Sequence, residues 1–170
     1  MMRWSPDEWK IAVAQMWSVK QRLSAVDHAF EHRLPRVAAT AMEIDDSERR
    51  IGEPLHPEQR GFLSVAGGWP AFWHDVDVLG PAELGRGELW NDGLERLSLL
   101  EHEGVVLAGV YMPVAVSRHD KDLFVISKRN GENWGELLWL AGEEVDRFPT
   151  FREFLLSMTE YLRSELAELE

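Results

Sequence analysis

The sequence predicts an α+β domain in which a mostly antiparallel sheet is flanked by helices. Apolar residues recur at helical spacing near both ends of the chain, whereas β-branched and aromatic residues dominate several short segments between residues 74 and 141. No repeated strand–helix–strand unit separates those segments. With 170 residues, 45% of them hydrophobic, the chain is long enough to build a core. We expect one domain over residues 1–170, with an N-terminal helical extension at 1–36 and a core at 40–165.

The first expected element is one long helix over residues 5–35. Ser5 can cap it, and Pro6 suits the first helical position. Pro35 should end it, because the residue before a proline disfavours helical geometry. Its apolar stripe consists of Trp9, Val13, Met16, Leu23, Val26 and Phe30.

Two shorter helices should follow. "AMEIDDSERRIG" is expected to end at Gly52, and "PEQRGFLSVAG" to begin at Pro57 and to close at Gly67 or Gly68 in the left-handed conformation. The inner face of the second helix should hold Phe62, Leu63 and Ala66.

The next stretch, "WPAFWHDVDVL", places two tryptophans around a proline and then alternates acidic and apolar residues. The alternation predicts a strand over 74–79. We expect Trp69 to pack inward between helix and sheet. Trp73 adjoins acidic residues and should be at least partly exposed, because aromatic side chains concentrate at binding interfaces.

The second half of the chain completes the predicted sheet. "LWNDGLERLSLLEHEG" indicates a helix, although Gly93 weakens it. Further strands are expected over 110–117, 121–129 and 136–141, because these segments are β-branched and aromatic and are separated by turn signals. The amphipathic segment "PTFREFLLSMTEYLRSELAEL" predicts a closing helix. Its buried stripe should hold Phe151, Phe154, Leu155, Met158, Tyr161 and Leu162.

Charge limits the classes of partner. The net charge of −12 argues against nucleic acid, whose phosphates need clustered lysine and arginine. Residues 1–40 hold six basic and four acidic side chains, a net +2, so the remaining residues carry −14. No apolar run is long enough to cross a membrane, and no cysteine is present. We expect a cytoplasmic protein with a protein partner, and with no nucleic-acid or membrane partner.

"HAFEH" matches the H-x-x-E-H pattern of one class of zinc peptidase. A metal-dependent hydrolase using His28, Glu31 and His32 is therefore one alternative. On a continuous helix, however, each histidine would lie about 200° from an apolar stripe residue and would point into solvent. The sequence also lacks a nucleophile elbow, a phosphate loop and a dinucleotide fingerprint. We expect no enzyme activity, metal or cofactor.

Residues 44–84, "IDDSERRIGEPLHPEQRGFLSVAGGWPAFWHDVDVLGPAEL", resemble the opening of the Smi1/Knr4 (SUKH) superfamily. "YMPVAVSRHDKDLFVISKR" and "ELLWLAGEEVDRFPTFREFL" are similar to its second half. "AGG" stands where many members have Asn-Gly-Gly. The resemblance implies a non-enzymatic protein. Bacterial members of this kind are immunity proteins that neutralise polymorphic toxins, whereas fungal members are regulatory scaffolds.

Acidic residues recur at the ends of the predicted strands, and these ends can converge on one rim of the sheet. Such a rim would attract a basic partner such as a toxin, with Trp73 as a desolvated anchor. The predicted partner-binding residues, on a monomer or a dimer, are Trp73, Asp75, Asp77, Asp120, Asp122, Glu143 and Glu144.

Overall fold

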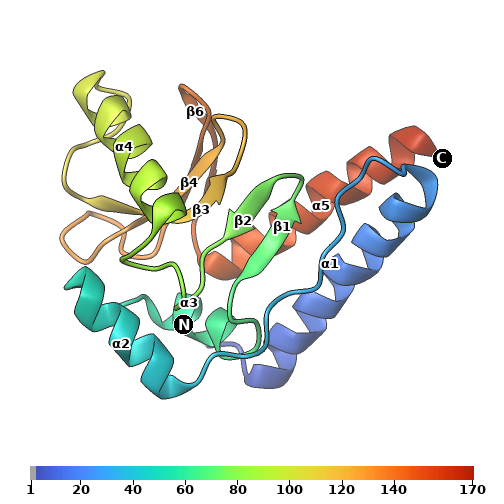
Figure 1. Cartoon of the computed structure of the whole chain (residues 1–170), viewed down its shortest axis with the longest axis horizontal. Helices are drawn as coiled ribbons and strands as arrows, with labels where there is room; N and C mark the ends of the chain where they lie inside the picture. Colours follow the sequence, from blue (N-terminus) through green and yellow to red (C-terminus); the bar gives the residue numbers. More distant parts are fainter. Residues whose placement is uncertain (1–2) are drawn as a thin grey trace.

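The computed structural model describes residues 3–170, which form five helices and one six-stranded antiparallel sheet (Figure 1). This confirms the predicted α+β class; residues 1 and 2 of the predicted domain lie outside the described residues. The helices are α1 (Pro6–Val26), α2 (Ala41–Ile51), α3 (Pro57–Leu63), α4 (Glu88–His102) and α5 (Phe151–Leu169). The strands are β1 (Trp69–Trp73), β2 (Val76–Val78), β3 (Tyr111–Ser117), β4 (Leu123–Ser127), β5 (Leu137–Leu140) and β6 (Glu144–Phe148).

The sheet is a meander whose strands follow one another in sequence order, so that β1 and β6 form its two edges. Helices cover both faces. Phe154 of α5 packs on Phe124, which lies opposite Ala115, whereas Gly93 of α4 lies against the next residue along β3, Val116. A Cβ atom on Gly93 would come within 3.0 Å of the Pro113 ring, so this glycine allows α4 to lie close to the sheet.

α1 begins as predicted but ends much earlier. Ser5 and Glu8 form a reciprocal capping box, and Pro6 is the first helical residue. The helix stops at Val26 because Asp27 adopts an extended conformation, and its side chain accepts a hydrogen bond from the Ala29 N–H at 3.0 Å. The expected continuation to Pro35 is therefore wrong.

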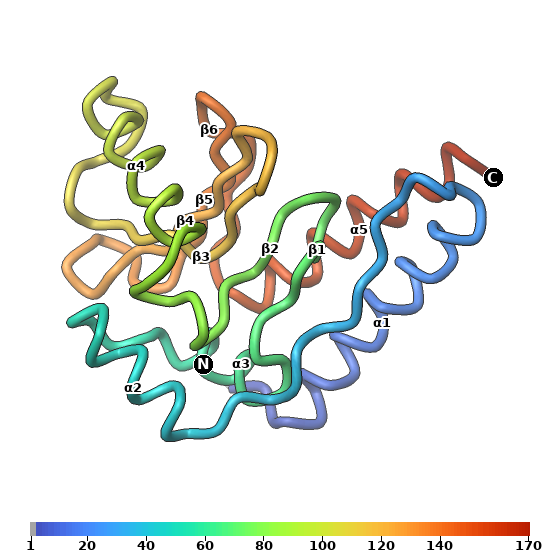
Figure 2. The backbone as a smooth tube through the Cα atoms, viewed as in Figure 1, coloured from blue at the N-terminus to red at the C-terminus, as the bar shows by residue number. Residues whose placement is uncertain are grey.

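The chain after α1 turns back and runs alongside it (Figure 2). The Arg36 N–H donates to the Gly68 carbonyl at 2.9 Å, and the Ala39 N–H donates to Leu63 at the same distance. The predicted stripe is corrected accordingly. Val26 is half exposed, and Phe30 is buried but lies in the segment after the helix. The buried residues of α1 itself are Trp9, Ala12, Met16, Val19, Lys20 and Leu23.

The two short helices differ in how well they were predicted. α2 ends at Gly52 in the left-handed conformation, as expected. α3 ends earlier than predicted, with Ser64 rather than Gly67 or Gly68 at its C-cap. Gly67 instead allows the backbone of residue 37 to approach closely, because a Cβ atom on Gly67 would lie 2.4 Å from the Val37 carbonyl oxygen. Phe62, Leu63 and Ala66 are fully buried, as predicted.

Two edge strands were not predicted. β1 is the "WPAFW" segment itself, and the expected strand over 74–79 is only its partner β2. β6 occupies residues that were expected to follow the last strand. The other three strands, β3, β4 and β5, agree with the predicted ranges to within two residues at each end.

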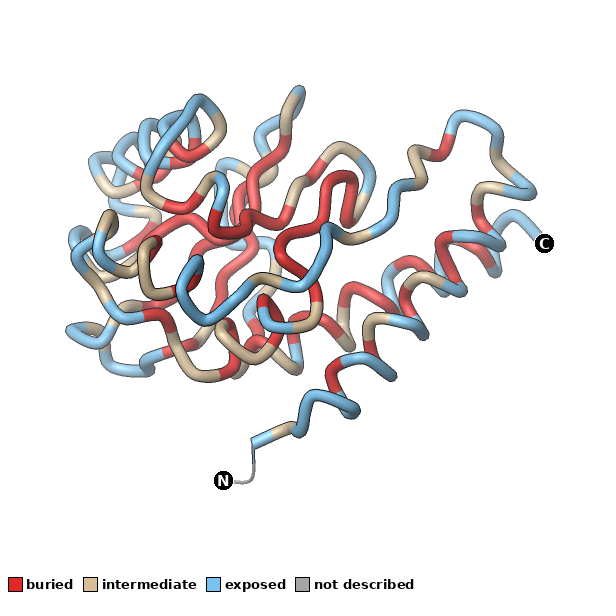
Figure 3. The backbone as a smooth tube through the Cα atoms, turned by 60° about the horizontal axis from the view of Figure 1, so that its bottom comes forward, coloured by how far each residue is buried: buried red, intermediate tan, exposed pale blue. Residues whose placement is uncertain are grey.

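The N-terminal helix belongs to the hydrophobic core. The buried sides of α1 and α5 face each other along their length (Figure 3), and Trp9 packs edge-on against Phe151. α5 confirms the predicted closing helix, but Tyr161 is 37% exposed and does not belong to its buried stripe. None of the described helices has both the length and the apolar content needed to cross a bilayer.

Candidate docking surface

Three hairpin turns lie at one end of the sheet. In a meander, the β1–β2, β3–β4 and β5–β6 turns fall on the same end, and here one hydrogen bond and one short approach bring them together. The Arg118 N–H donates to the Asp75 carbonyl at 3.1 Å, and Lys121 Nζ lies 3.9 Å from the position of a Cβ on Gly142. We call the six predicted acidic residues at these turns the acidic rim. They are Asp75, Asp77, Asp120, Asp122, Glu143 and Glu144.

Three rim carboxylates are used to build the hairpins. Asp75 accepts hydrogen bonds from the Ser117 hydroxyl and the His119 N–H, both at 2.9 Å. Asp77 accepts from the Ala71 N–H at 2.8 Å and from Arg118 at 3.1 Å. These carboxylates fix the turn positions and are only partly exposed.

Asp122 is the third structural carboxylate, because it accepts the indole N–H of Trp139 at 2.8 Å. The remaining members of the rim, Asp120, Glu143 and Glu144, are exposed at the turns. Of these three, Glu144 is ion-paired with Arg147, whereas Asp120 and Glu143 form no ion pair within residues 3–170. The sequence could not distinguish the two groups, because all six residues follow the same pattern.

The rim also carries more positive charge than its sequence suggests. Lys121 lies between Asp120 and Asp122 in the sequence. Arg118, however, pairs with Asp77 and with Glu31, and the hydrogen bond to Glu31 is the main reason that its pKa is raised. Arg147 pairs with Glu144 at 2.6 Å and with Glu136 at 2.8 Å. The rim is therefore a mixed surface rather than a uniformly negative one.

The two tryptophans of the first hairpin differ as predicted. Trp69 is fully buried, and its indole N–H donates to the Arg33 carbonyl at 2.8 Å. Trp73 is partly exposed and meets Trp139 edge-on, with 4.9 Å between ring centroids. Trp139 in turn meets Tyr161 of α5 at 5.3 Å. These contacts connect the rim to the outer side of α5.

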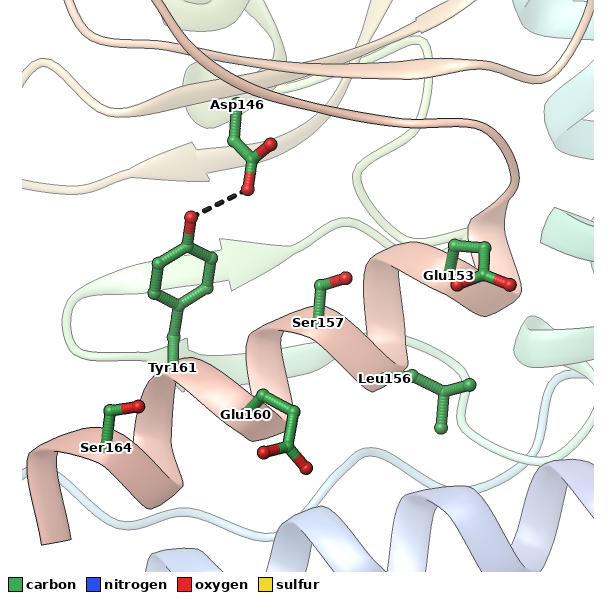
Figure 4. Close-up of a pocket in the computed structure, with 7 residues that line it drawn as sticks. All are labelled: Asp146, Glu153, Leu156, Ser157, Glu160, Tyr161 and Ser164. Atoms are coloured by element: carbon green, nitrogen blue, oxygen red, sulfur yellow. Dashed lines mark hydrogen bonds between the residues drawn. The ribbon is translucent and has the colours of Figure 1, made fainter. Parts of the chain in front are cut away.

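Beside the rim, a groove of about 430 Å³ lies between β6 and α5 (Figure 4). Tyr161 donates its hydroxyl hydrogen to Asp146 at 2.6 Å, and this bond raises the pKa of Tyr161 to about 12. We call this hollow the acidic groove, because it is lined by three carboxylates and by no lysine or arginine. Its lining residues are Asp146, Glu153, Leu156, Ser157, Glu160, Tyr161 and Ser164.

Sequence reasoning missed the acidic groove for two reasons. β6 was not predicted, so Asp146 had no place in the sheet, and Tyr161 was assigned to the core. A signal was nevertheless present, since Glu153, Ser157, Glu160 and Ser164 recur at helical spacing on the side of α5 away from its apolar stripe.

The "HAFEH" segment does not have the geometry of a zinc peptidase. It follows the end of α1, so His28 and His32 do not lie one turn apart on a helix. Glu31 pairs with Arg118 at 2.8 Å, and the His32 ring stacks on Trp17 at 4.1 Å. Burial lowers the pKa of His32. Over residues 3–170, no group of three or more histidine, cysteine or acidic side chains could hold a metal ion.

Comparison of the sequence with models of known protein families gives no match, and no curated protein matches it significantly.

Proposed function

We propose that this chain is a non-enzymatic protein-binding domain that docks a basic partner on the acidic rim and the acidic groove. The observation that carries the proposal is the run of carboxylates from one feature to the other, in which Asp146 is partly exposed and Glu144 and Glu160 are each paired with an arginine of the same element. Asp120, Glu143 and Glu144 at the turns lead into Asp146, Glu153 and Glu160 beside α5. The partly exposed rings of Trp73 and Tyr161 lie along the same path.

This arrangement suits recognition of a basic protein in two ways. Exposed carboxylates steer a cationic partner toward the surface and raise the association rate. Aromatic side chains supply apolar area that is desolvated on contact and slows dissociation. Because half of the rim carboxylates are bound within the hairpins, the surface is held in place before any partner arrives.

The resemblance of residues 44–84 and of the second half to the SUKH superfamily supports a more specific proposal. In that reading the partner is a bacterial toxin with a basic surface, and the chain is the immunity protein that neutralises it in the cytoplasm. The test begins with partners captured from the source cell, followed by co-expression with the captured protein. A toxin halts growth and the chain restores it, whereas a partner that is harmless on its own indicates a regulatory module.

The docking surface itself is tested by charge reversal. Glu143→Lys with Glu144→Lys should slow association with the captured partner by about tenfold at low ionic strength, and added salt should narrow the difference. The matched control is Glu88→Lys with Glu132→Lys. Both of these residues are exposed, and Glu132 lies in the β4–β5 turn at the other end of the sheet. Equal association rates for the two double variants would contradict the proposed surface.

A further inference from the structure

Two arginines face a hollow at the end of the sheet opposite the acidic rim. The hollow has a volume of about 200 Å³ and lies between α2 and the segment that joins β2 to α4 (Figure 1). Arg50 of α2 and Arg86 of that segment line it, together with Glu43, Asp46, Pro81 and Ala82. Because the segment leaves β2 at the end away from the β1–β2 turn, the hollow is separate from the proposed docking surface.

Arg50 is held in place by the backbone of the segment between β2 and α4. Its Nε and Nη2 donate to the Leu84 carbonyl at 3.1 and 2.8 Å, and Nη2 also donates to the Pro81 carbonyl. Gly85, with a φ of 82°, allows this close approach, because a Cβ atom there would lie 3.1 Å from the Arg50 Cβ. The guanidinium group is thus oriented before any ligand arrives, and Nη1 is left to bind one.

Neither arginine has an acidic partner of its own. Within residues 3–170, Arg50 and Arg86 form no ion pair, and Arg86 donates from its Nε to the Ala82 carbonyl at 3.1 Å. Backbone carbonyls are neutral, so they orient the two guanidinium groups without cancelling their charge. The pKa of Arg50 is lowered, chiefly because burial disfavours its charged form and also because the Arg86 cation is close, while Asp46 offsets part of this effect.

The two carboxylates that line the hollow do not balance the arginines. Asp46 already pairs with Arg49. Glu43 accepts the Thr40 N–H at 3.0 Å at the start of α2, ~10 Å along the helix from Arg50. Once Asp46 is counted with Arg49, two cations face Glu43 alone. The hollow therefore carries a net positive charge in a chain whose net charge is −12.

We infer that Arg50 and Arg86 bind a phosphoryl group, either as free phosphate or as a small phosphate monoester. Two guanidinium groups match the double negative charge of a phosphate. Arg50 offers Nη1, and Arg86 offers both terminal nitrogens because only its Nε is engaged, so donors from two directions can reach the phosphate oxygens. A carboxylate carries a single charge and two oxygens, so it should bind more weakly.

Nuclear magnetic resonance can measure binding at the two side chains themselves. Inorganic phosphate is titrated into the isotope-labelled protein at constant ionic strength and about pH 8, where phosphate is mainly a dianion. The Nε–H signals of Arg50 and Arg86 should shift together with a dissociation constant of about 1 mM. Acetate should bind about tenfold more weakly. Equal affinities for phosphate and acetate would overturn the inference.

Glycerol phosphate identifies the source of the phosphoryl group. If it binds more tightly than inorganic phosphate, the hollow takes a monoester whose substituent also contacts the protein. If it binds equally or more weakly, free phosphate is the ligand. Binding of neither compound at the two arginines would show that the hollow is not a phosphoryl site.

Two variants should change the phosphate affinity in opposite directions. Arg86→Gln removes one cation but leaves the contacts of Arg50 in place, and it should weaken phosphate binding about tenfold. Asp46→Asn removes the carboxylate that offsets Arg50, and it should tighten binding about threefold. The control is Arg33→Gln, which removes an exposed arginine from the segment after α1 and should leave the affinity unchanged. If Arg86→Gln and Arg33→Gln bind phosphate equally well, the arginine pair does not form the site and the inference is wrong.

Discussion

The two edge strands of the sheet, β1 and β6, differ in how far the rest of the chain covers them. At the β1 edge the chain covers itself, because α1 and the segment after it pack on the strand and bury four of its five residues. At the β6 edge, Glu144, Val145 and Arg147 are exposed, and charged side chains rather than other parts of the chain protect the strand. The closed edge is therefore stabilising, whereas the open edge and the adjoining acidic groove are where a partner has access.

A buried lysine holds the closed edge together. Lys20 of α1 is fully buried, and its ammonium group donates to the carbonyl oxygens of Ala71 and Phe72, the latter at 3.0 Å. The same group lies over the rings of Phe30 and Trp69 at 5.4 and 5.7 Å. Ala71 has a φ of 52°, which is strained for a residue with a Cβ atom. Lys20 thus stabilises a backbone conformation that alanine alone would not favour.

The largest expected effect comes from removing this contact. Lys20→Ala leaves two buried carbonyl groups without their donor and opens a cavity, so it should lower the free energy of unfolding by about 3–5 kcal/mol. Lys10→Ala removes an exposed lysine from the same helix and should change it by less than about 0.5 kcal/mol. Urea denaturation measures both. Equal stabilities of the two variants would mean that the closed edge does not depend on Lys20.

The second prediction uses pH. Burial lowers the pKa of Lys20 to about 8, from an ordinary value of 10.5. Between these values the unfolded chain binds more protons than the folded one, so stability contributed by this group rises with pH. Relative to Lys20→Met, the wild type should gain about 2 kcal/mol between pH 7 and pH 9.5. Urea midpoints that move in parallel for the two proteins would show that the Lys20 pKa is not lowered by burial.

The contrast between the edges also explains what the sequence could predict. The starts of α1 and α2 could be predicted because they depend on hydrogen bonds between residues three apart in the sequence, namely Ser5 with Glu8 and Thr40 with Glu43. Neither edge strand was readable. β1 contains Pro70 and is buried on both faces, so it shows no alternation, and β6 is "EVDRF", a charged strand with little apolar signal.

The docking surface was predictable only in its position. The sequence placed the acidic residues at strand ends, but only the turn between β3 and β4 was predicted, because the turns at β1 and β6 need strands that the sequence did not reveal. The division of the rim into structural and exposed carboxylates depends on contacts between distant residues, such as Asp122 with Trp139 and Asp77 with Arg118. Such contacts have no local pattern, and neither does the pairing of Asp146 with Tyr161 across the acidic groove.

The third prediction concerns how much a contact at the open edge contributes to the free energy of unfolding. Tyr161→Phe removes the hydroxyl that donates to Asp146, but both side chains are partly exposed and water can replace the bond. The free energy of unfolding should fall by only about 1 kcal/mol. Urea denaturation beside Lys20→Ala gives the ratio of the two costs. A loss as large as that of Lys20→Ala would mean that both edges are structural, and the contrast between them would disappear.

The smallest expected effect belongs to a side-chain contact that joins the first hairpin turn to α5. His74 Nε2 lies 2.9 Å from Glu165, and this hydrogen bond is the main reason that the pKa of His74 is raised. A raised pKa in the folded state contributes stability that is present below about pH 6.5 and is lost as pH rises through the folded value. Because both side chains are partly exposed, the contribution should be below about 1 kcal/mol.

His74→Gln can hydrogen-bond to Glu165 at every pH, so the difference in urea midpoint between wild type and variant should shrink from pH 5.5 to pH 8. His32 and His56 have lowered pKa values and shift stability in the opposite direction, but they are present in both proteins and cancel in the comparison. A difference that stays constant with pH would show that the turn and α5 are joined by packing alone, and that charge at His74 does not couple the closed edge to the open one.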